Sequence, residues 1–162
     1  MEALLGESTS LLNDTIKIDP VFFLLLLDAH RASGNHEQAI NIWKTETLPV
    51  YKVVLGDHPW TASILRYIAG SYRCLAKSGY VDSGMADQAG KYSREALQLR
   101  IKLLGERHDT ARSHVDLSDS LIIKAIKQLE EAIEIQKKVL GEDHETTEKT
   151  ISQLGKLKSM IE

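Results

Sequence analysis

Histidines are the residues of this sequence that most invite a chemical role, because imidazole is a common ligand of transition metals. The chain contains six. Three of them follow a Leu-Gly pair closely and are expected in turns or as helix caps: His58, His108 and His144. Of the others, His30 is expected in the core and His36 in a turn. His108 and His114 are six positions apart, which is the wrong phase for one helical face, and no His-x-x-x-His occurs. We therefore expect no metal site.

The candidates for acid/base and nucleophilic chemistry also have simpler interpretations. The carboxylate pairs Asp116/Asp119 and Glu130/Glu131 are expected on solvated helix faces rather than as acid/base pairs. Cys74, the only cysteine, stands beside Leu75 and is expected as a small core residue. The sequence has no Gly-rich phosphate loop, no Gly-x-Ser-x-Gly and no Cys-x-x-Cys. We expect no catalytic or cofactor-binding residue, no cofactor and no enzymatic activity.

The composition fits one soluble globular domain, residues 1–162. Hydrophobic residues make up 43% and charged residues 27%, which argues against disorder. The formal net charge of −3 excludes the strongly basic balance of a general nucleic-acid binder. A single cysteine excludes a disulfide framework and favours the cytoplasm. The most apolar run, residues 21–27, is too short to cross a bilayer and is not a signal peptide, so no membrane partner is expected.

A repeated motif organises the chain. Leu55-Gly56-Asp57-His58-Pro59-Trp60-Thr61-Ala62 is followed by related segments at 104–111 and 140–147. In each copy the Leu ends an amphipathic run and the Gly is expected to take the left-handed conformation that closes a helix. An Asp or Thr shortly afterwards can cap the next helix. The glycines are 49 residues apart from Gly56 to Gly105 and 36 apart from Gly105 to Gly141.

Small residues mark the second helix of each unit. Ala89 and Ala96, like Ala125 and Ala132, are seven residues apart and so lie on one helical face, where a neighbouring helix can approach closely. In the earliest of these units, the segment from Ala39 to Gly56 contains Pro49, where we expect a kink or bulge.

These signals predict an all-α fold of about eight helices that stack as antiparallel hairpins into a solenoid. The expected helices are 2–14, 20–33, 36–55, 61–77, 86–104, 110–120, 123–140 and 146–161. They divide the chain into a leading helix (1–18), three hairpins (19–56, 57–105 and 106–141) and a terminal single helix (142–162).

The motif Leu-Gly-x-x-His-x-x-Thr-Ala, followed by a helix, Gly-x-x-x-x-Ala and a second helix, resembles the long tetratricopeptide repeat of kinesin light chains and nephrocystin-type proteins. Gly34-Asn35-His36-Glu37-Gln38-Ala39 is similar to the turn between the two helices of that repeat. The resemblance covers residues from about 19 to 161. It implies a scaffold or adaptor that binds other proteins.

The third hairpin departs from this pattern because it lacks about six residues, including the turn glycine, so that Lys124 runs directly into Ala125. Either the turn is tightened onto Ser118, Asp119 and Ser120, or the two helices join into one rod, or the natural protein has turn residues that this sequence lacks. A rod would expose Ile126 and its apolar neighbours. We therefore expect a break within 118–124, and a continuous helix only if a second chain supplies the missing partner by domain swapping.

The first helices of the repeats are expected to line a concave, partly basic groove that binds an acidic peptide or helix. The groove residues are Leu24, Asp28, Arg31, Ser63, Arg66, Arg73, Arg112, Asp119, Lys149 and Lys156. The alternative function is self-assembly, in which the apolar faces of the terminal helices join copies of the chain into a homo-oligomer.

Overall fold

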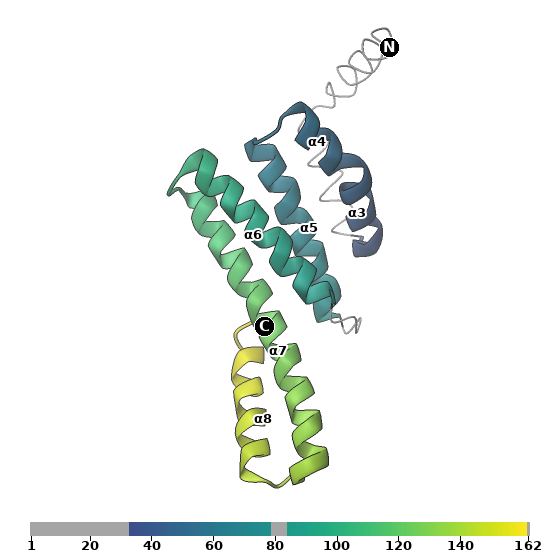
Figure 1. The fold of residues 1–162 in the computed structure, drawn as a ribbon, viewed down its shortest axis with the longest axis vertical. Coiled ribbons are helices and arrows are strands. Elements are labelled where there is room, and N and C mark those ends of the chain that lie inside the picture. Colours follow the sequence, from purple (N-terminus) through teal and green to yellow (C-terminus); the bar gives the residue numbers. More distant parts are fainter. Residues whose placement is uncertain (1–32, 79–83, 162) are drawn as a thin grey trace. The chain divides into compact units, whose positions relative to one another are not determined.

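The structure is a computed structural model of the chain, and it describes residues 33–78 and 84–161. These residues are helical and contain no strand, which confirms the all-α class. In chain order the elements are α3 (His36–Ile42), the π-helical turn η1 (Trp43–Thr47), α4 (Leu48–Val54), α5 (Pro59–Lys77), α6 (Gly84–Leu104), α7 (His108–Leu140) and α8 (Glu145–Lys158) (Figure 1). The expected helices 2–14 and 20–33 lie outside the described residues, apart from Ser33.

The glycine turns have the positive φ that the motif predicts. Gly56, Gly105 and Gly141 have φ values of 58°, 61° and 97°, so the positive φ of the predicted conformation is confirmed at all three. The ψ of 163° places Gly141 outside the left-handed helical region. A positive φ is strained for any residue with a side chain, which explains why the three turns share glycine.

The helix caps are made by histidine rather than by the expected Asp or Thr. The Nδ1 atom of His58 accepts a hydrogen bond from the Trp60 backbone N–H at 3.2 Å, and His144 accepts from Thr146 at 3.2 Å. The expected capping role of these two histidines is thus confirmed. His108 instead begins α7, which has Arg107 at its N-cap and no side-chain cap.

The threonines of the motif also stabilise the turns, through hydrogen bonds back to the glycine carbonyls. The Thr61 hydroxyl donates to the Gly56 carbonyl at 3.0 Å, Thr110 donates to Gly105 at 2.7 Å, and Thr147 donates to Gly141 at 3.0 Å. All three threonines are buried. Each hydroxyl therefore satisfies a carbonyl that the end of the preceding helix leaves without a helical partner.

The predicted irregularity near Pro49 is confirmed, because the π-helical turn η1 comes immediately before α4, in whose first turn Pro49 lies. Proline has no N–H to donate, so the backbone adjusts one turn earlier. The Thr45 hydroxyl donates to the Asn41 carbonyl at 2.8 Å and supports this adjustment.

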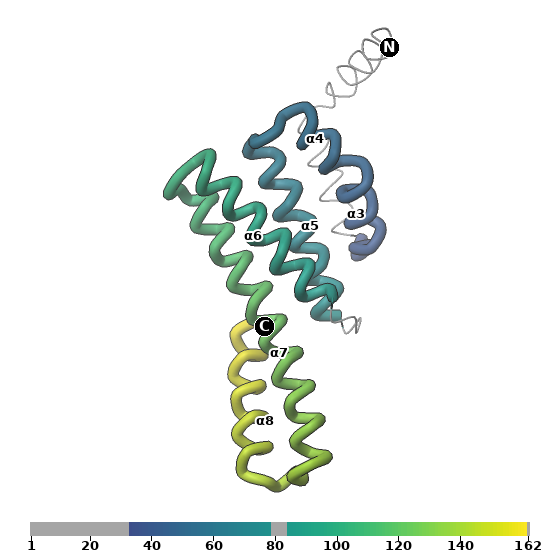
Figure 2. Tube along the Cα trace, viewed as in Figure 1, coloured from purple at the N-terminus to yellow at the C-terminus, as the bar shows by residue number. Residues whose placement is uncertain are grey.

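Helix α5 is the centre of the packing. It contacts α3, η1 and α4 on one side and α6 on another, and it also reaches α7. Its buried face includes Ile64, Leu65, Ile68 and Ala69, each at most 2% exposed. Neighbouring helices α5, α6 and α7 run in alternating directions, as the tube in Figure 2 shows. Tyr72 of α5 and Tyr92 of α6 stack with ring centroids 5.8 Å apart.

The expected break within 118–124 is absent. Helix α7 runs unbroken for 33 residues, so the expected helices 110–120 and 123–140 are one element and do not form a hairpin. Its first half packs against α6 and α5, and α8 packs along its second half (Figure 1).

Two features explain the continuity. The Ser120 hydroxyl, predicted as a cap, instead donates to the Asp116 carbonyl four residues earlier at 2.9 Å and pairs with Ser93 of α6 at 3.1 Å. Ser120 is fully buried in the middle of α7 and caps no helix. In addition, the apolar side chains that a rod was expected to expose are covered, since Ile126 and Ile133 are buried where α8 folds back along α7.

The middle of α7 is anchored where three helix ends meet. Ile123 forms a core cluster with Ala76 at the end of α5 and Ala86 at the start of α6. Ile161, which follows α8, packs against this cluster, and its carbonyl accepts a hydrogen bond from the Lys77 ammonium at 2.9 Å. The region of the expected break is therefore held from several sides.

Candidate partner-binding surfaces

A cluster of arginines lies where α5, α6 and the first half of α7 meet. The carboxylate of Asp116 on α7 accepts hydrogen bonds from Arg66 Nε at 2.7 Å and from Arg73 at 2.9 Å. Arg73 also donates to the Asp116 backbone carbonyl at 2.9 Å. The arginine side chains are each 17% exposed, and that of Asp116 is 13% exposed. Arg66 and Arg73 are seven residues apart on α5 and so lie on one helical face, where a single carboxylate can bind both.

Arg100 of α6 is the most buried charge of the cluster, at 6% exposed. Its guanidinium donates to the Asp109 carbonyl at 3.0 Å, to the Ser113 hydroxyl at 2.9 Å and, at 3.4 Å, to Ser63. Burial lowers the pKa of Arg100 from its usual value, and the neighbouring charge of Arg66 lowers it further. The carboxylates of Asp109 and Asp116 act in the opposite direction and raise this pKa.

The structure places the predicted groove residues in three groups. Ser63, Arg66 and Arg73 meet in the arginine cluster, and Arg112 and Asp119 lie on the same half of α7, Arg112 being exposed. Lys149 and Lys156 are exposed on α8, beside the other half of a helix about 50 Å long. Leu24, Asp28 and Arg31 lie outside the described residues. The structure thus joins α5 to the first half of α7 but does not bring the α8 lysines to them.

The pairing with Asp116 changes the expected character of Arg66 and Arg73. Charges that line an open groove are expected to be solvated, whereas Arg66 and Arg73 both pair with Asp116 between α5 and α7. Their loss is expected to affect folding as well as binding, since a mostly buried ion pair leaves an uncompensated charge when one partner is removed.

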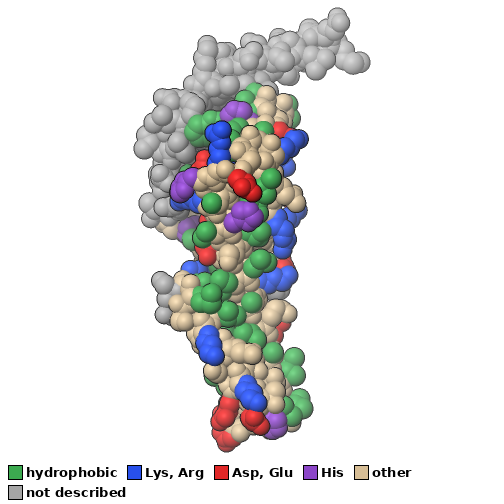
Figure 3. Space-filling model, turned by 90° about the vertical axis from the view of Figure 1, so that its left-hand side faces the viewer, with side chains coloured by type: hydrophobic (Ala, Val, Ile, Leu, Met, Phe, Trp, Pro, Cys, Tyr) green, Lys and Arg blue, Asp and Glu red, His purple; other side chains and the backbone are tan. Residues whose placement is uncertain are grey.

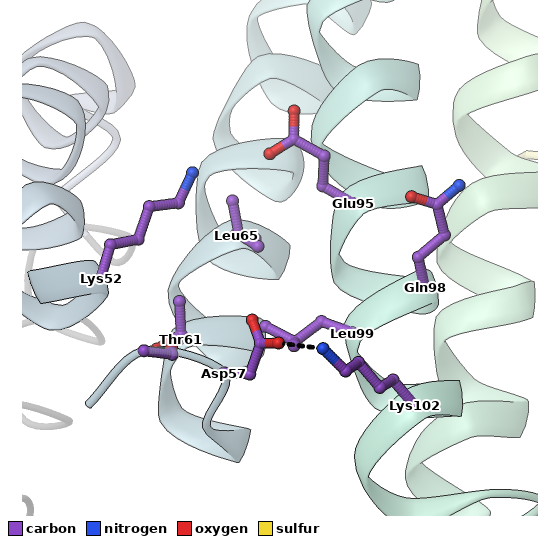
Figure 4. A pocket seen from close by; sticks show the side chains of 9 residues that line it. Lys52, Asp57, Thr61, Leu65, Glu95, Gln98, Leu99 and Lys102 are labelled. Carbon is purple, nitrogen blue, oxygen red and sulfur yellow. Dashed lines mark hydrogen bonds and ion pairs between the residues drawn. The ribbon is translucent and has the colours of Figure 1, made fainter.

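A cleft of about 480 Å³ opens between α4, α5 and α6 (Figure 4). Asp57 and Lys102 form an ion pair across one end, and Glu95 and Gln98 point from α6 toward the space. Leu65 and Leu99 supply an apolar floor. The lining thus combines apolar side chains with charges of both signs.

The remaining candidates for chemistry are not assembled into a site by the described residues. Cys74 is exposed on α5, so its expected core position is wrong. Among residues 33–78 and 84–161, no three His, Cys, Asp or Glu side chains are grouped to hold a metal ion. Within the same residues, none of the helices is both long and apolar enough to span a membrane.

Exposed hydrophobic side chains concentrate on α7. Half of the large hydrophobic residues found exposed in the described chain belong to this helix: Val115, Leu121, Ile135, Val139 and Leu140. Figure 3 shows one face of the molecule, on which hydrophobic side chains lie between charges of both signs. The open face of α7 is therefore a second candidate surface, and it differs in chemistry from the arginine cluster.

Comparison with known proteins bears on the segment that joins α7 to α8. Residues 123–146 match the family model of the tetratricopeptide repeat. This match supports a tetratricopeptide repeat protein and hence a protein–protein interaction module. The matched residues include the Ala125/Ala132 pair and the turn at Gly141, both of which the sequence pattern marks. No curated protein matches the chain.

Several residues of the arginine cluster are absent from the predicted groove. Asp116 was interpreted as a solvated carboxylate, and Arg100 and Ser113 were not singled out. Asp116 carries a weak signal, because it lies four residues after Arg112 and three before Asp119 on one helix. Its partners on α5 are 43 and 50 residues away in sequence, so only the packing of the two helices reveals the pair.

Proposed function

We propose that this protein is a non-catalytic adaptor that binds an acidic segment of a partner protein on the surface formed by α5 and the first half of α7. The tetratricopeptide repeat match supports the general class, since this repeat serves protein–protein interaction. The likeness of the Leu-Gly turns to those of kinesin light chains and nephrocystin-type proteins belongs to the same proposal, as does a cytoplasmic location.

The observation that carries the proposal is an imbalance of charge. Two guanidinium groups, those of Arg66 and Arg73, share the single carboxylate of Asp116, and the buried guanidinium of Arg100 lies near enough for the charges of Arg66 and Asp116 to act on its pKa. The further charges that act on Arg100 come from Asp109 and Arg112 and oppose one another. The cluster thus keeps an excess of positive charge although the chain as a whole is negative. Such a focused field attracts a carboxylate.

Arg66 has donors to spare for that carboxylate. It bonds Asp116 through its Nε atom, and its terminal nitrogens carry further N–H groups that can donate to a second carboxylate. Arg112 is exposed on α7, next to the cluster. Arginine binds carboxylates through two parallel N–H groups, which makes these residues suitable anchors for Asp, Glu or a chain terminus.

The test uses an array of acidic peptides and one charge reversal outside the buried pairs. Arg112→Glu should weaken binding of the peptides that the unmodified protein retains by about ten- to a hundredfold, since a hydrogen bond to a charged group contributes about 1.5–3 kcal/mol. Thermal stability should change little, because Arg112 is exposed. Lys138→Glu, an equal charge change on the second half of α7, is the matched control and should leave binding intact. Equal binding by both variants would exclude this surface.

A further inference from the structure

The second half of α7 carries an apolar stripe that no described helix covers. Leu121, Ala125, Ala132, Ile135 and Val139 follow one another at intervals of three, four or seven residues and so share one helical face. Ile135 is 64% exposed and Val139 is 73% exposed, and the two alanines are only half-buried. The face that α8 covers, with Ile126 and Ile133, is a different one.

The repeat shows that this stripe is built to be buried. Ala89 and Ala96 of α6 stand 36 residues before Ala125 and Ala132, in the same register from the turn glycine. Both are completely buried between α6 and its neighbours. The same face of the same repeat unit is therefore covered on α6 and open on α7.

The first half of α7 also has an exposed face that its counterpart in the repeat buries. Ala62 and Ala69 on α5 are completely buried, but the residues 49 positions later, Ala111 and Ser118, are exposed. In a regular hairpin these positions of the first helix meet the alanine face of the second helix. On α7 they continue the stripe toward the N-terminus, since Ser118 lies three residues before Leu121 and Ala111 lies seven residues before Ser118.

The two halves of α7 are thus hairpin partners that cannot meet, because an unbroken helix separates them end to end. A second α7 running in the opposite direction would place its first half on this second half, and its second half on this first half. Ala111 would face Val139, Ser118 would face Ala132, and Ala125 would face its own copy. A face that is complementary to itself in this way is the requirement for a two-fold symmetric dimer.

We propose that two copies of this chain associate through the open faces of their α7 helices, antiparallel, with Ala125 of both copies at the centre. This dimer does not depend on the acidic segment proposed for the arginine cluster, because it rests on apolar contact rather than on charge and uses different residues.

The size of the stripe and its lack of charged residues are compatible with a second copy of the chain. From Ala111 to Val139 the stripe runs for about 42 Å along a helix about 10 Å wide, so that pairing buries roughly 850 Å² in total. This is below the range of about 1,000–1,200 Å² of stable specific interfaces, so the association is expected to be weak and to depend on concentration. The stripe positions contain no Asp, Glu, Lys or Arg, whereas such residues are frequent on the rest of α7, and the polar residues along the stripe are His114, Ser118 and Gln128. Small residues at the centre allow the two backbones to approach closely.

Light scattering on the full chain at a low and a high concentration tests the association. The unmodified protein should be a dimer at the high concentration. Ile135→Lys should raise the dissociation constant by at least about a hundredfold, since symmetry removes the apolar contact twice. Circular dichroism should show unchanged helicity, because Ile135 is exposed within one copy. Val53→Lys on α4, at an 80% exposed position, is the matched control and should leave the dimer intact.

Disulfide formation tests the register. Ala125→Cys, made together with Cys74→Ser, should give a covalent dimer under mild oxidation, whereas Val53→Cys in the same background should not. A protein that stays monomeric at the high concentration would overturn the proposal. A dimer that is insensitive to Ile135→Lys and is not linked through position 125 would place the interface elsewhere and overturn it as well.

Discussion

Asp116 is the residue on which the packing of α7 against α5 depends most directly. It accepts from two arginines at 2.7 and 2.9 Å and is 13% exposed, so its charge is balanced by neighbouring guanidinium groups rather than by water. Its backbone carbonyl also accepts from the buried Ser120 hydroxyl, which in turn pairs with Ser93. One position thus connects three helices.

Removing this charge should be costly. Asp116→Asn leaves Arg66 and Arg73 without their counter-charge and should lower the free energy of unfolding by about 2–3 kcal/mol, as measured by urea denaturation. Lys102→Gln, which breaks the exposed pair with Asp57, should cost less than about 1 kcal/mol. Similar losses in the two variants would show that Asp116 is only a surface carboxylate.

Local signals in the sequence predict the turns well but miss this network. The glycines with positive φ follow from the Leu-Gly motif, and the capping by His58 and His144 depends only on atoms two residues apart. The pairing of Asp116 depends on how α5 and α7 lie against each other, which no local pattern specifies. The predicted groove therefore contains Arg66 and Arg73 without the carboxylate that pairs with them.

At the scale of elements, the predicted helices within residues 33–78 and 84–161 agree with the structure where a turn glycine or a proline limits them. Where neither is present, between Thr110 and Leu140, the prediction of a break is wrong. It rested on the capping preference of Ser118, Asp119 and Ser120 and on the cost of exposing Ile126. Ser120 forms its hydrogen bonds within and across helices instead, and α8 covers Ile126.

Restoring the missing turn should restore the hairpin. We expect that inserting a copy of residues 33–38, which includes the left-handed Gly34, between Lys124 and Ala125 lets the second half of α7 fold back onto the first. The stripe would then be buried within one chain, and light scattering should show a monomer at concentrations where the unmodified protein is a dimer. An insertion of the same length made of alanines favours a continued helix and is the control. Dimers of equal strength in both variants would contradict this account.

At the scale of the whole molecule, α7 connects two packing groups. Its first half belongs with α5 and α6, its second half belongs with α8, and Ile123 lies at the junction. The two candidate surfaces use different forces, since charge dominates at the arginine cluster and apolar contact dominates along the stripe. Both surfaces exist in their present form because α7 is continuous. A hairpin in its place would bury the stripe and leave the protein with the arginine surface alone.

The most direct test of the account is the distance between the two ends of α7 within one chain. Spin labels on cysteines at Arg112 and Lys138, both exposed, in a Cys74→Ser background report this distance by pulsed electron resonance. Dilution with excess unlabelled protein removes distances between copies. A continuous helix predicts a separation of about 39 Å for 26 residues at 1.5 Å each. A separation below about 20 Å, as expected for two helices packed side by side, would show a hairpin and contradict the account.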